Sequence, residues 1–191
     1  MKRSLLTVAA LLVGMSTPAL AIDSNLSTIQ QLGGTNSSAS QTQTGTDTKN
    51  TAFTRQVGGT GNTADTTQGG DMSVNSAVTF QFGSNEMATV TQEGDNNHNT
   101  SILTQAGGSN DATIHQHGDT NLALSDVHIQ AGFNNSIDVE QHGSGNSHDS
   151  FISTFSHGST VGVEQHGSDN TNKSTVTTGI TGGNTAMVNQ Q

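Results

Sequence analysis

Histidines recur directly after a glutamine, at spacings that would let their side chains act together. His117, His142 and His166 follow one another at steps of 25 and 24 residues, and His115 lies two residues before the first of them. Imidazole nitrogens bind transition metals, and they titrate near neutral pH. Such a column could bind a metal ion or make assembly depend on pH, whereas the alternative is a solvated polar face. We expect the solvated face, and therefore no metal site and no cofactor, with His117, His142 and His166 as the weaker candidate ligands.

Carboxylates recur in the same way. Asp71, Asp95 and Asp119 each follow a glycine, at steps of 24 residues. If these side chains stack, their charges repel one another unless cations or protons intervene. Negative charge at such places also slows aggregation, so the three aspartates are candidate gatekeepers. A calcium-binding β-roll is not indicated, because the Gly-Gly-x-Gly-x-Asp repeat is missing.

The serines, histidines and acidic residues form no motif typical of an enzyme. There is no His-Glu-x-x-His, no P-loop and no nucleophile elbow. A solenoid hydrolase or lyase would need a cleft of acidic residues that interrupts the repeat. The polar residues instead repeat along the chain and do not converge on one pocket, as an active site requires. We therefore expect a protein that is not an enzyme.

The element that must position these residues is a repeat built on the phrase Gln-x-Gly-x-x-Asn. The phrase occurs four times between residues 105 and 146. One series of copies begins at residues 31, 56, 81, 105, 130 and 156, with Ser156 in a glutamine place. The other series begins at residues 43, 68, 92, 116, 141, 165 and 190. Steps within each series are 24 to 26 residues, so the chain contains about seven repeats of two similar halves.

Each half-repeat predicts a strand followed by a tight corner. Residues 112–116, 137–141 and 161–165 alternate between apolar or glutamine positions and polar ones, a period of two. The corners contain glycine and asparagine, which adopt positive φ readily. A unit that cannot bury its own face stacks on copies of itself. The sequence therefore predicts an all-β fold, a two-sheet parallel β-solenoid of the cross-β kind, with about seven rungs of about 25 residues.

Glutamines on the inner faces can satisfy one another as an amide ladder. Stacked at the strand spacing, each carboxamide bonds the amides above and below, which offsets the cost of burying it. Aliphatic residues two places before several of these glutamines would fill the remaining space. The predicted self-assembly core comprises Gln56, Gln68, Gln81, Gln92, Gln105, Gln116, Gln130, Gln141, Gln165 and Gln190, with Asn97, Asn110, Asn121, Asn135, Asn146 and Asn170. Its corner glycines are Gly83, Gly94, Gly107, Gly118, Gly132, Gly143 and Gly167.

Composition limits the class of protein. Hydrophobic residues make up 29% of the 191 residues and aromatic residues 3%, too little for an ordinary packed core. A disordered Gln/Asn-rich tract is the alternative, but it does not predict a constant step. The formal net charge of −10 provides no means of holding nucleic acid or an anionic membrane. No specific small-molecule ligand is indicated.

The N-terminal segment 1–21 has the features of a signal peptide. Lys2 and Arg3 precede an apolar run, and residues 19–21 form a small-x-small cleavage site. The predicted mature chain begins at Ile22 and is exported. Residues 22–43 form an N-terminal segment with a degenerate first repeat, and residues 44–191 form the repeat solenoid. The chain has no cysteine, so disulfides do not stabilise it.

Apolar residues are predicted on the outer side of one sheet. Phe80, Ile129 and Phe155 take outward places there, and Val57 and Phe82 lie just beyond a glutamine. A continuous apolar stripe would suit packing between protofilaments or against a cell surface. Aromatic residues scattered over the strands are the alternative.

These repeats resemble the curlin repeat of bacterial curli fibre subunits, whose motif is Ser-x5-Gln-x-Gly-x-x-Asn-x-Ala-x3-Gln. The best copy matches at Gln105, Gly107, Asn110, Ala112 and Gln116. A second copy matches at residues 81, 83, 88 and 92, with asparagine 85 one place early. A third matches at residues 130, 132, 135 and 141, with isoleucine 137 in the alanine place. The resemblance covers nearly all of the predicted mature chain and departs at residues 156 and 161 and in the last repeat.

The resemblance implies a subunit of an extracellular functional amyloid, a fimbrium used in adhesion and in the biofilm matrix. It implies that the chain polymerises with itself, that a nucleator subunit starts the polymer, and that an outer-membrane pore with periplasmic helpers exports it unfolded to the bacterial surface. Residues 22–43 would be the address for that pore. We favour the major structural subunit over the nucleator.

A second class of protein is a monomeric secreted solenoid that binds ice or polysaccharide through a flat face. The run Thr42, Thr44, Thr46 and Thr48 is the feature that favours it. An ice-binding array would have to recur from rung to rung, and this run does not.

Overall fold

The structure is a computed structural model that describes residues 24–119, 122–144, 147–155, 157–168, 171–179 and 182–191. Side chains are described for all of these except 122–131 and 147–148. The predicted signal peptide, residues 1–21, lies outside the described residues. The described part of the chain contains no helix, and hence none long and apolar enough to cross a membrane.

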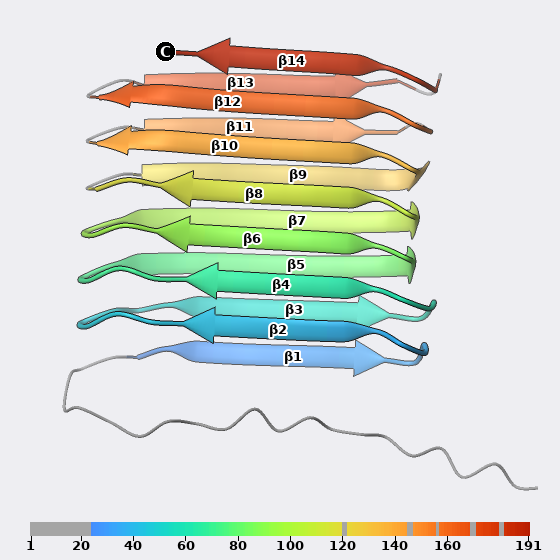
Figure 1. The fold of residues 1–191 in the computed structure, drawn as a ribbon, viewed down its shortest axis with the longest axis horizontal. Coiled ribbons are helices and arrows are strands. Elements are labelled where there is room, and N and C mark those ends of the chain that lie inside the picture. Colours follow the sequence, from blue (N-terminus) through green and yellow to red (C-terminus); the bar gives the residue numbers. More distant parts are fainter. Residues whose placement is uncertain (1–23, 120–121, 145–146, 156, 169–170, 180–181) are drawn as a thin grey trace, which may run out of the picture.

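The described strands form two parallel sheets that face one another (Figure 1). One sheet contains the seven odd-numbered strands and the other the seven even-numbered strands, so each consecutive pair is one rung. We call them the odd sheet and the even sheet. This arrangement confirms the predicted two-sheet parallel β-solenoid. The strands are β1 (Leu26–Leu32), β2 (Ser38–Gln43), β3 (Thr51–Val57), β4 (Thr63–Gln68), β5 (Val74–Ser84), β6 (Met87–Glu93), β7 (His98–Gly108), β8 (Asp111–His117), β9 (Leu122–Phe133), β10 (Ser136–Ser144), β11 (Ser147–Thr154), β12 (Thr160–Ser168), β13 (Thr171–Thr178) and β14 (Thr185–Gln190).

Neighbouring rungs pair in a nearly constant register. Leu26 of β1 lies opposite Thr51 of β3, a step of 25 residues along the chain. Met87 of β6 lies opposite Asp111 of β8, a step of 24 residues. Because side chains alternate between the two faces of a strand, a slip of one residue would turn every inward side chain outward. The nearly constant step therefore keeps like residues in columns along the solenoid.

A β-bulge in β9 is the exception. Gln105 of β7 lies opposite Ile129 of β9, and after a register shift Gly107 lies opposite Gly132. Between these points β9 has one residue more than β7, and the extra residue is taken up within the strand pair. The prediction that Gln130 is in register with Gln105 is therefore wrong.

The same shift changes the assignments in the next rung. Thr154 of β11 lies opposite Ile129, and Thr178 of β13 lies opposite Thr154. Thr154 thus occupies the glutamine place that was predicted for Ser156. It is fully buried, as an inward position requires. The backbone of Ile129 is in register with Gln105 and Thr154, but its side chain, for which an outward place was predicted, is outside those that the structure describes.

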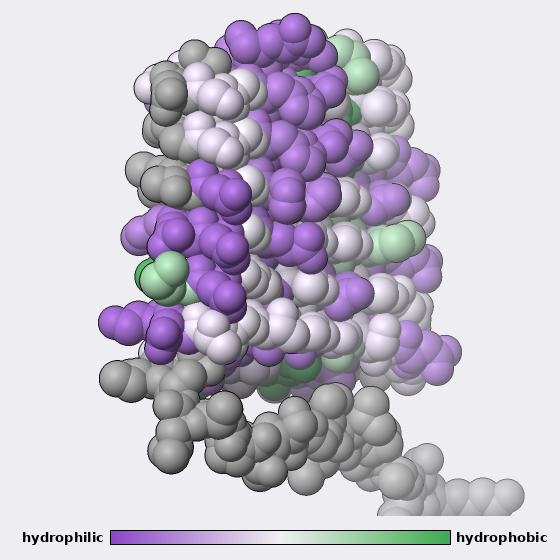
Figure 2. Space-filling model, turned by 60° about the vertical axis from the view of Figure 1, so that its left-hand side comes forward, coloured by the Kyte–Doolittle hydropathy of each residue, from purple (hydrophilic) through white to green (hydrophobic). Residues whose placement is uncertain are grey.

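The interior is narrow and mixes small aliphatic residues with polar ones. Val90, Leu103, Ile114, Val139 and Val163, predicted two places before a glutamine, are all buried. Ile29, in the first rung, is 40% exposed. Figure 2 shows an outer surface that is mostly hydrophilic, with hydrophobic residues in small separate groups. A core this thin does not suffice alone, so buried polar groups must contribute to cohesion.

Apolar residues gather on the outer side of the odd sheet in its N-terminal half. The ring of Phe80 lies 5.7 Å from that of Phe53 and 6.3 Å from that of Phe82, measured between centroids. Val57 pairs with Phe82 across β3 and β5. Phe155 follows β11, at the other end of the solenoid, and is exposed. The predicted apolar residues thus form a local patch in the second and third rungs, with Phe155 apart from it.

Candidate functional site

Glutamines of the even sheet form one continuous ladder through all seven rungs. At each step the side-chain Nε2 donates to the Oε1 of the glutamine one rung later, over 2.7 to 2.9 Å. The five central members are almost completely buried. The ladder consists of Gln43, Gln68, Gln92, Gln116, Gln141, Gln165 and Gln190.

The same amides also join the two sheets. Nε2 of Gln68 donates to the carbonyl oxygen of Thr51 at 3.1 Å, and Nε2 of Gln92 donates to that of Ser76 at 3.1 Å. A carboxamide has two N–H donors. Here one donates to the next glutamine of the same sheet, and the other donates to a backbone carbonyl oxygen of the opposite sheet. The side chains are satisfied although buried, and each one links three strands.

The odd sheet has a shorter ladder. Nε2 of Gln31 donates to Gln56 at 2.7 Å, Gln56 to Gln81 at 2.8 Å and Gln81 to Gln105 at 3.0 Å. The next residue in this column is Ile129, because of the bulge in β9. Among the residues whose side chains are described, this ladder includes four rungs, and the backbone register places Ile129, not Gln130, opposite Gln105.

Asparagines form a column at the corner between odd and even strands. Oδ1 of Asn110 accepts from the backbone N–H and the side-chain Nδ2 of Asn135, at 3.2 and 3.0 Å. Oδ1 of Asn135 accepts from the backbone N–H of Ser159 at 3.0 Å. Asn97 lies at the opposite corner, where its Nδ2 donates to the carbonyl oxygen of Glu93 at 2.9 Å. Of the other predicted asparagines, Asn121, Asn146 and Asn170 lie outside the described residues.

A glutamate that the sequence analysis did not single out occupies this column. The N–H of Glu86 donates to Oδ1 of Asn62 at 3.1 Å, and its Oε1 accepts from Nδ2 of Asn110 at 3.3 Å. Asn85, matched in the sequence to the motif asparagine one residue early, has φ of 56° and forms the corner. The equal steps from Asn62 to Glu86 and from Glu86 to Asn110 are the signal that could have identified Glu86.

The Glu86 carboxyl is buried without full compensation. The residue is 1% exposed, and no hydrogen bond from the described residues reaches its Oε2. Burial raises the pKa of Glu86 to about 7, against the opposing effect of the hydrogen bonds from Asn110. Glu86 is thus the one ionisable group among the described residues that interrupts a buried amide column.

Corner glycines are required by the close approach of successive rungs. A Cβ at Gly107, where φ is +123°, would lie 1.9 Å from the carbonyl oxygen of Gly132. A Cβ at Gly83 would lie 2.0 Å from that of Gly107. No side chain fits at such a distance. Positive φ is also found at the predicted corner glycines Gly94, Gly118, Gly143 and Gly167.

The three aspartates stack as a column at an exposed corner. Oδ1 of Asp119 accepts from the backbone N–H of Asp95 at 3.1 Å, and Oδ1 of Asp95 accepts from that of Asp71 at 2.8 Å. Oδ1 of Asp71 accepts from the hydroxyl and the backbone N–H of Thr46, and these bonds hold the pKa of Asp71 below its usual value. Each carboxylate therefore binds a backbone N–H of the preceding rung, which offsets the repulsion along the column.

The histidines lie on the outer face of the even sheet. His117, His142 and His166 are in register, and the rings of His142 and His166 stack with centroids 5.2 Å apart. The ring centroid of His115 lies 5.2 Å from that of His142. Glu140, which the sequence analysis did not single out, completes a group with them. Single ligand atoms of His115, Glu140 and His142 all lie within 4.8 Å of one another.

Comparison with protein families identifies the repeat. The family model of the curlin associated repeat matches residues 59–94 and 107–143. The chain contains curlin repeats. Curlin repeats indicate a family of curli-type fibre subunits, which are structural proteins that self-assemble into extracellular fibres. Comparisons with curated proteins and with solved structures found no match.

The geometry gives each residue of the curlin motif a separate task. The two matched segments span β4 to β6 and β8 to β10, and they contain five ladder glutamines. The motif glutamine joins rungs and sheets, the glycine lets corners stack, and the asparagine bonds the corner backbone. The motif alanine, as at fully buried Ala112, keeps the sheets close enough for the amide to cross. These tasks all depend on a neighbouring rung.

Breaking the ladder at its centre should destabilise the fold. In Gln92→Leu, the Nε2 of Gln68 loses its acceptor and the Oε1 of Gln116 loses its donor, both in the buried interior. We expect a loss of about 2–4 kcal/mol in the free energy of unfolding, measured by urea denaturation. Gln30→Leu makes the same change at an exposed position and should have little effect. Equal stability of the two variants would contradict the role of the ladder.

Replacing Glu86 by glutamine should remove a pH dependence of stability. A carboxyl whose pKa rises from 4.5 to about 7 on folding binds more protons in the folded state within that window. The free energy of unfolding therefore falls as pH rises from about 4.5 to 7. At pH 8, Glu86→Gln should be more stable than the unchanged protein by about 1–2 kcal/mol, and at pH 4 nearly equal to it. Urea denaturation at pH 4, 6 and 8 measures this difference. Glu93→Gln, on the outer face, is the matched control.

Proposed function

We propose that this protein is the major structural subunit of an extracellular curli-type amyloid fibre that serves adhesion and the biofilm matrix. The observation that carries the proposal is the even-sheet ladder, whose two ends are complementary. Among the described residues no donor reaches Oε1 of Gln43, whereas Nε2 of Gln190 uses one hydrogen for the carbonyl oxygen of Lys173. The second hydrogen of Gln190 could bond Gln43 of another subunit. Head-to-tail addition would then extend the ladder without a break, as an open filament requires.

The outer strands support the same direction of growth. β1 and β2 at one end, and β13 and β14 at the other, pair with no further strand among the described residues. Such edges present backbone N–H and C=O groups to a new strand. The first rung also exposes the inward residue Ile29, opposite the buried Thr54, and a stacked subunit would cover it. Growth by stacking would thus bury apolar surface as well as satisfy the backbone.

The partners proposed beyond the chain itself follow from the family. A nucleator subunit would supply the first template, and an outer-membrane pore with periplasmic helpers would export the unfolded chain. Residues 22–43 would be the address that the pore reads. This segment includes β1 and β2, so it would serve first as an unfolded address and then as the first rung. The aspartate column would act as a gatekeeper that slows assembly before export.

The monomeric ice- or polysaccharide-binding alternative has less support. Thr42 of the even sheet is in register with Thr67 and Thr91, but the next residue in this outward column is His115. A flat threonine array would therefore extend over three rungs and then give way to histidine and glutamate.

Polymerisation from the unfolded chain tests the proposal directly. The chain from Ile22 to Gln191, diluted from denaturant into neutral buffer without seeds, should show a lag in dye binding. Fibres should follow, with one diffraction spacing of about 4.7 Å and another of about 10 Å. A stable solution of folded, β-rich monomer would contradict the fibre proposal. Deleting the gene should remove surface fibres and leave no soluble fibre subunit, whereas loss of a nucleator would leave soluble major subunit behind.

A charge placed inward on the last strand should block growth. Val188 of β14 lies inward and pairs with Val163, so the next rung would bury the carboxylate of Val188→Asp. We expect elongation from seeds to slow at least tenfold while the monomer keeps its β-rich spectrum. Thr185→Asp adds the same charge at an exposed position of the same strand and should elongate normally. Equal elongation rates for the two variants would argue against addition at this end.

A further inference from the structure

The outer face of the even sheet changes character along the solenoid. The outward column that contains Thr67 and Thr91 in the early rungs continues with His115, Glu140 and Glu164. The adjacent outward column contains His117, His142 and His166 in the same rungs. A column with two carboxylates therefore runs beside a column of imidazoles, on a parallel sheet whose strands lie about 4.8 Å apart.

Three side chains in this region come close enough to share one ion. Nε2 of His142 lies 2.7 Å from Oε1 of Glu140, both on β10, and the His115 ring on β8 meets that of His142 edge-on. One ligand atom from each of the three lies within 4.8 Å of the others. All three side chains are partly buried, so the surrounding strands restrict their movement.

We propose that His115, Glu140 and His142 bind a divalent transition-metal ion such as Zn²⁺ or Cu²⁺. Two imidazoles and a carboxylate suit these ions, whereas Ca²⁺ and Mg²⁺ prefer oxygen ligands alone. Bonds of about 2.0–2.2 Å to the ion require ligand atoms roughly 3.3 Å apart. Rotation of these side chains closes the remaining gap without moving the backbone. The ion would leave at least one coordination position for water or for His117, whose ring centroid is 5.7 Å from that of His142.

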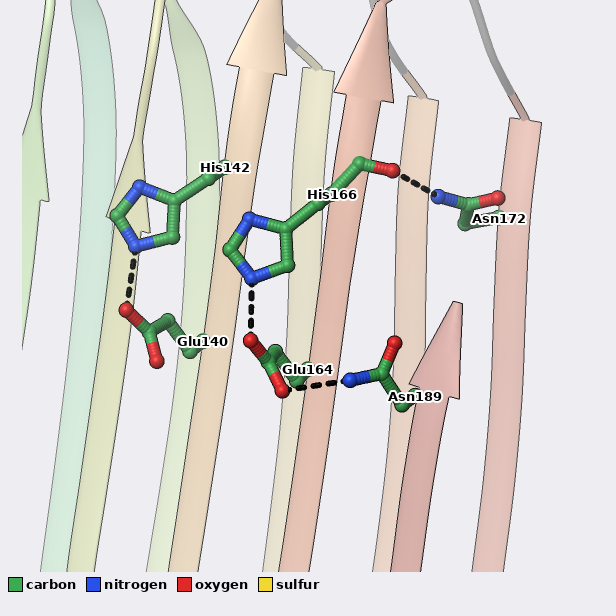
Figure 3. Close-up of polar contacts among 6 residues, drawn as sticks. All are labelled: Glu140, His142, Glu164, His166, Asn172 and Asn189. Atoms are coloured by element: carbon green, nitrogen blue, oxygen red, sulfur yellow. Dashed lines mark hydrogen bonds and ion pairs between the residues drawn. The ribbon is translucent and has the colours of Figure 1, made fainter. Parts of the chain in front are cut away.

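The next rung shows why one position is preferred. Glu164 and His166 repeat the contact of Glu140 and His142, with the same 2.7 Å between Oε1 and Nε2 (Figure 3). For Glu164 and His166, the residue on the preceding strand in the place that His115 takes for Glu140 and His142 is Glu140 itself. Oε2 of Glu164 also accepts from Asn189. The second group therefore offers one imidazole where the first offers two, and it binds these ions less well.

The site goes beyond the proposed fibre function and does not depend on it. All three ligands come from one chain, so the ion binds a folded monomer and a fibre alike. It would link two adjacent strands, β8 and β10, across the sheet. In a head-to-tail fibre the sites would recur once per subunit, about every 34 Å for seven rungs.

Metal titration of designed variants tests the site. Calorimetry with Zn²⁺, and paramagnetic resonance with Cu²⁺, should show one ion per chain and coordination by two imidazole nitrogens. His115→Ala, and separately His142→Ala, should weaken binding at least tenfold and abolish the rise in melting temperature caused by Zn²⁺. His98→Ala removes a histidine at the start of β7, on the other sheet, and should bind as the unchanged protein does.

Three outcomes would overturn the assignment. They are the absence of binding by the folded protein, an affinity unchanged by His115→Ala, and an equal loss in His98→Ala. A loss in His166→Ala without one in His115→Ala would place the ion on the stacked histidines instead, which also contradicts the proposal. Circular dichroism of the metal-free variants separates lost ligands from lost fold. Fibre growth is measured independently, so failure of this site and failure of the fibre proposal are distinguishable.

Discussion

The hydrogen bond between one buried glutamine amide and the next is the interaction on which this fold depends. A buried carboxamide without partners would destabilise the protein. Here the oxygen accepts from one neighbouring rung, one N–H donates to the other neighbour, and the second N–H crosses to the opposite sheet, as at Gln68 and Gln92. The satisfied amide needs identical neighbours at the strand spacing. A sequence with 29% hydrophobic residues therefore folds because it repeats, and one rung could not fold alone.

That requirement restricts where the chain can vary. Rungs that differ in length by one residue coexist because most of the difference is absorbed in the corners, where residues such as Asn85 and Ser109 adopt positive φ. The glycines there allow backbones to meet within distances that no side chain tolerates. In β9 the extra residue falls inside the strand pair, and the register of one column shifts. The odd ladder ends at that point, so a single residue decides how far it extends.

The sequence predicted the period, the two parallel sheets and the in-register columns, because each follows from spacing alone. It did not predict the bulge, because Gln130 matches the repeat motif in the sequence, whereas in the strand it is Ile129 that lies opposite Gln105. Glu86 was missed for a similar reason. Asn85 is the residue type that the motif expects, but its positive φ places it in the corner, and Glu86 takes the place in the asparagine column. Glu140 lies directly opposite His115, and the contact of His115 with His142 is diagonal across two strands. Such contacts need the register as well as the repeat.

The two halves of the odd sheet show that the solenoid has two means of holding a rung. In the second and third rungs the ladder glutamines Gln56 and Gln81 stand beside inward threonines, Thr54 and Thr79. In the sixth and seventh rungs, where threonines replace the glutamines, the adjacent inward residues are Ile152 and Val176. Loss of amide bonding is thus accompanied by a gain in buried apolar surface. In the proposed fibre the even ladder would pass from Gln190 to Gln43, whereas the odd column would bring Thr178 against Gln31. Each junction would then depend on the even sheet for its amide bonds.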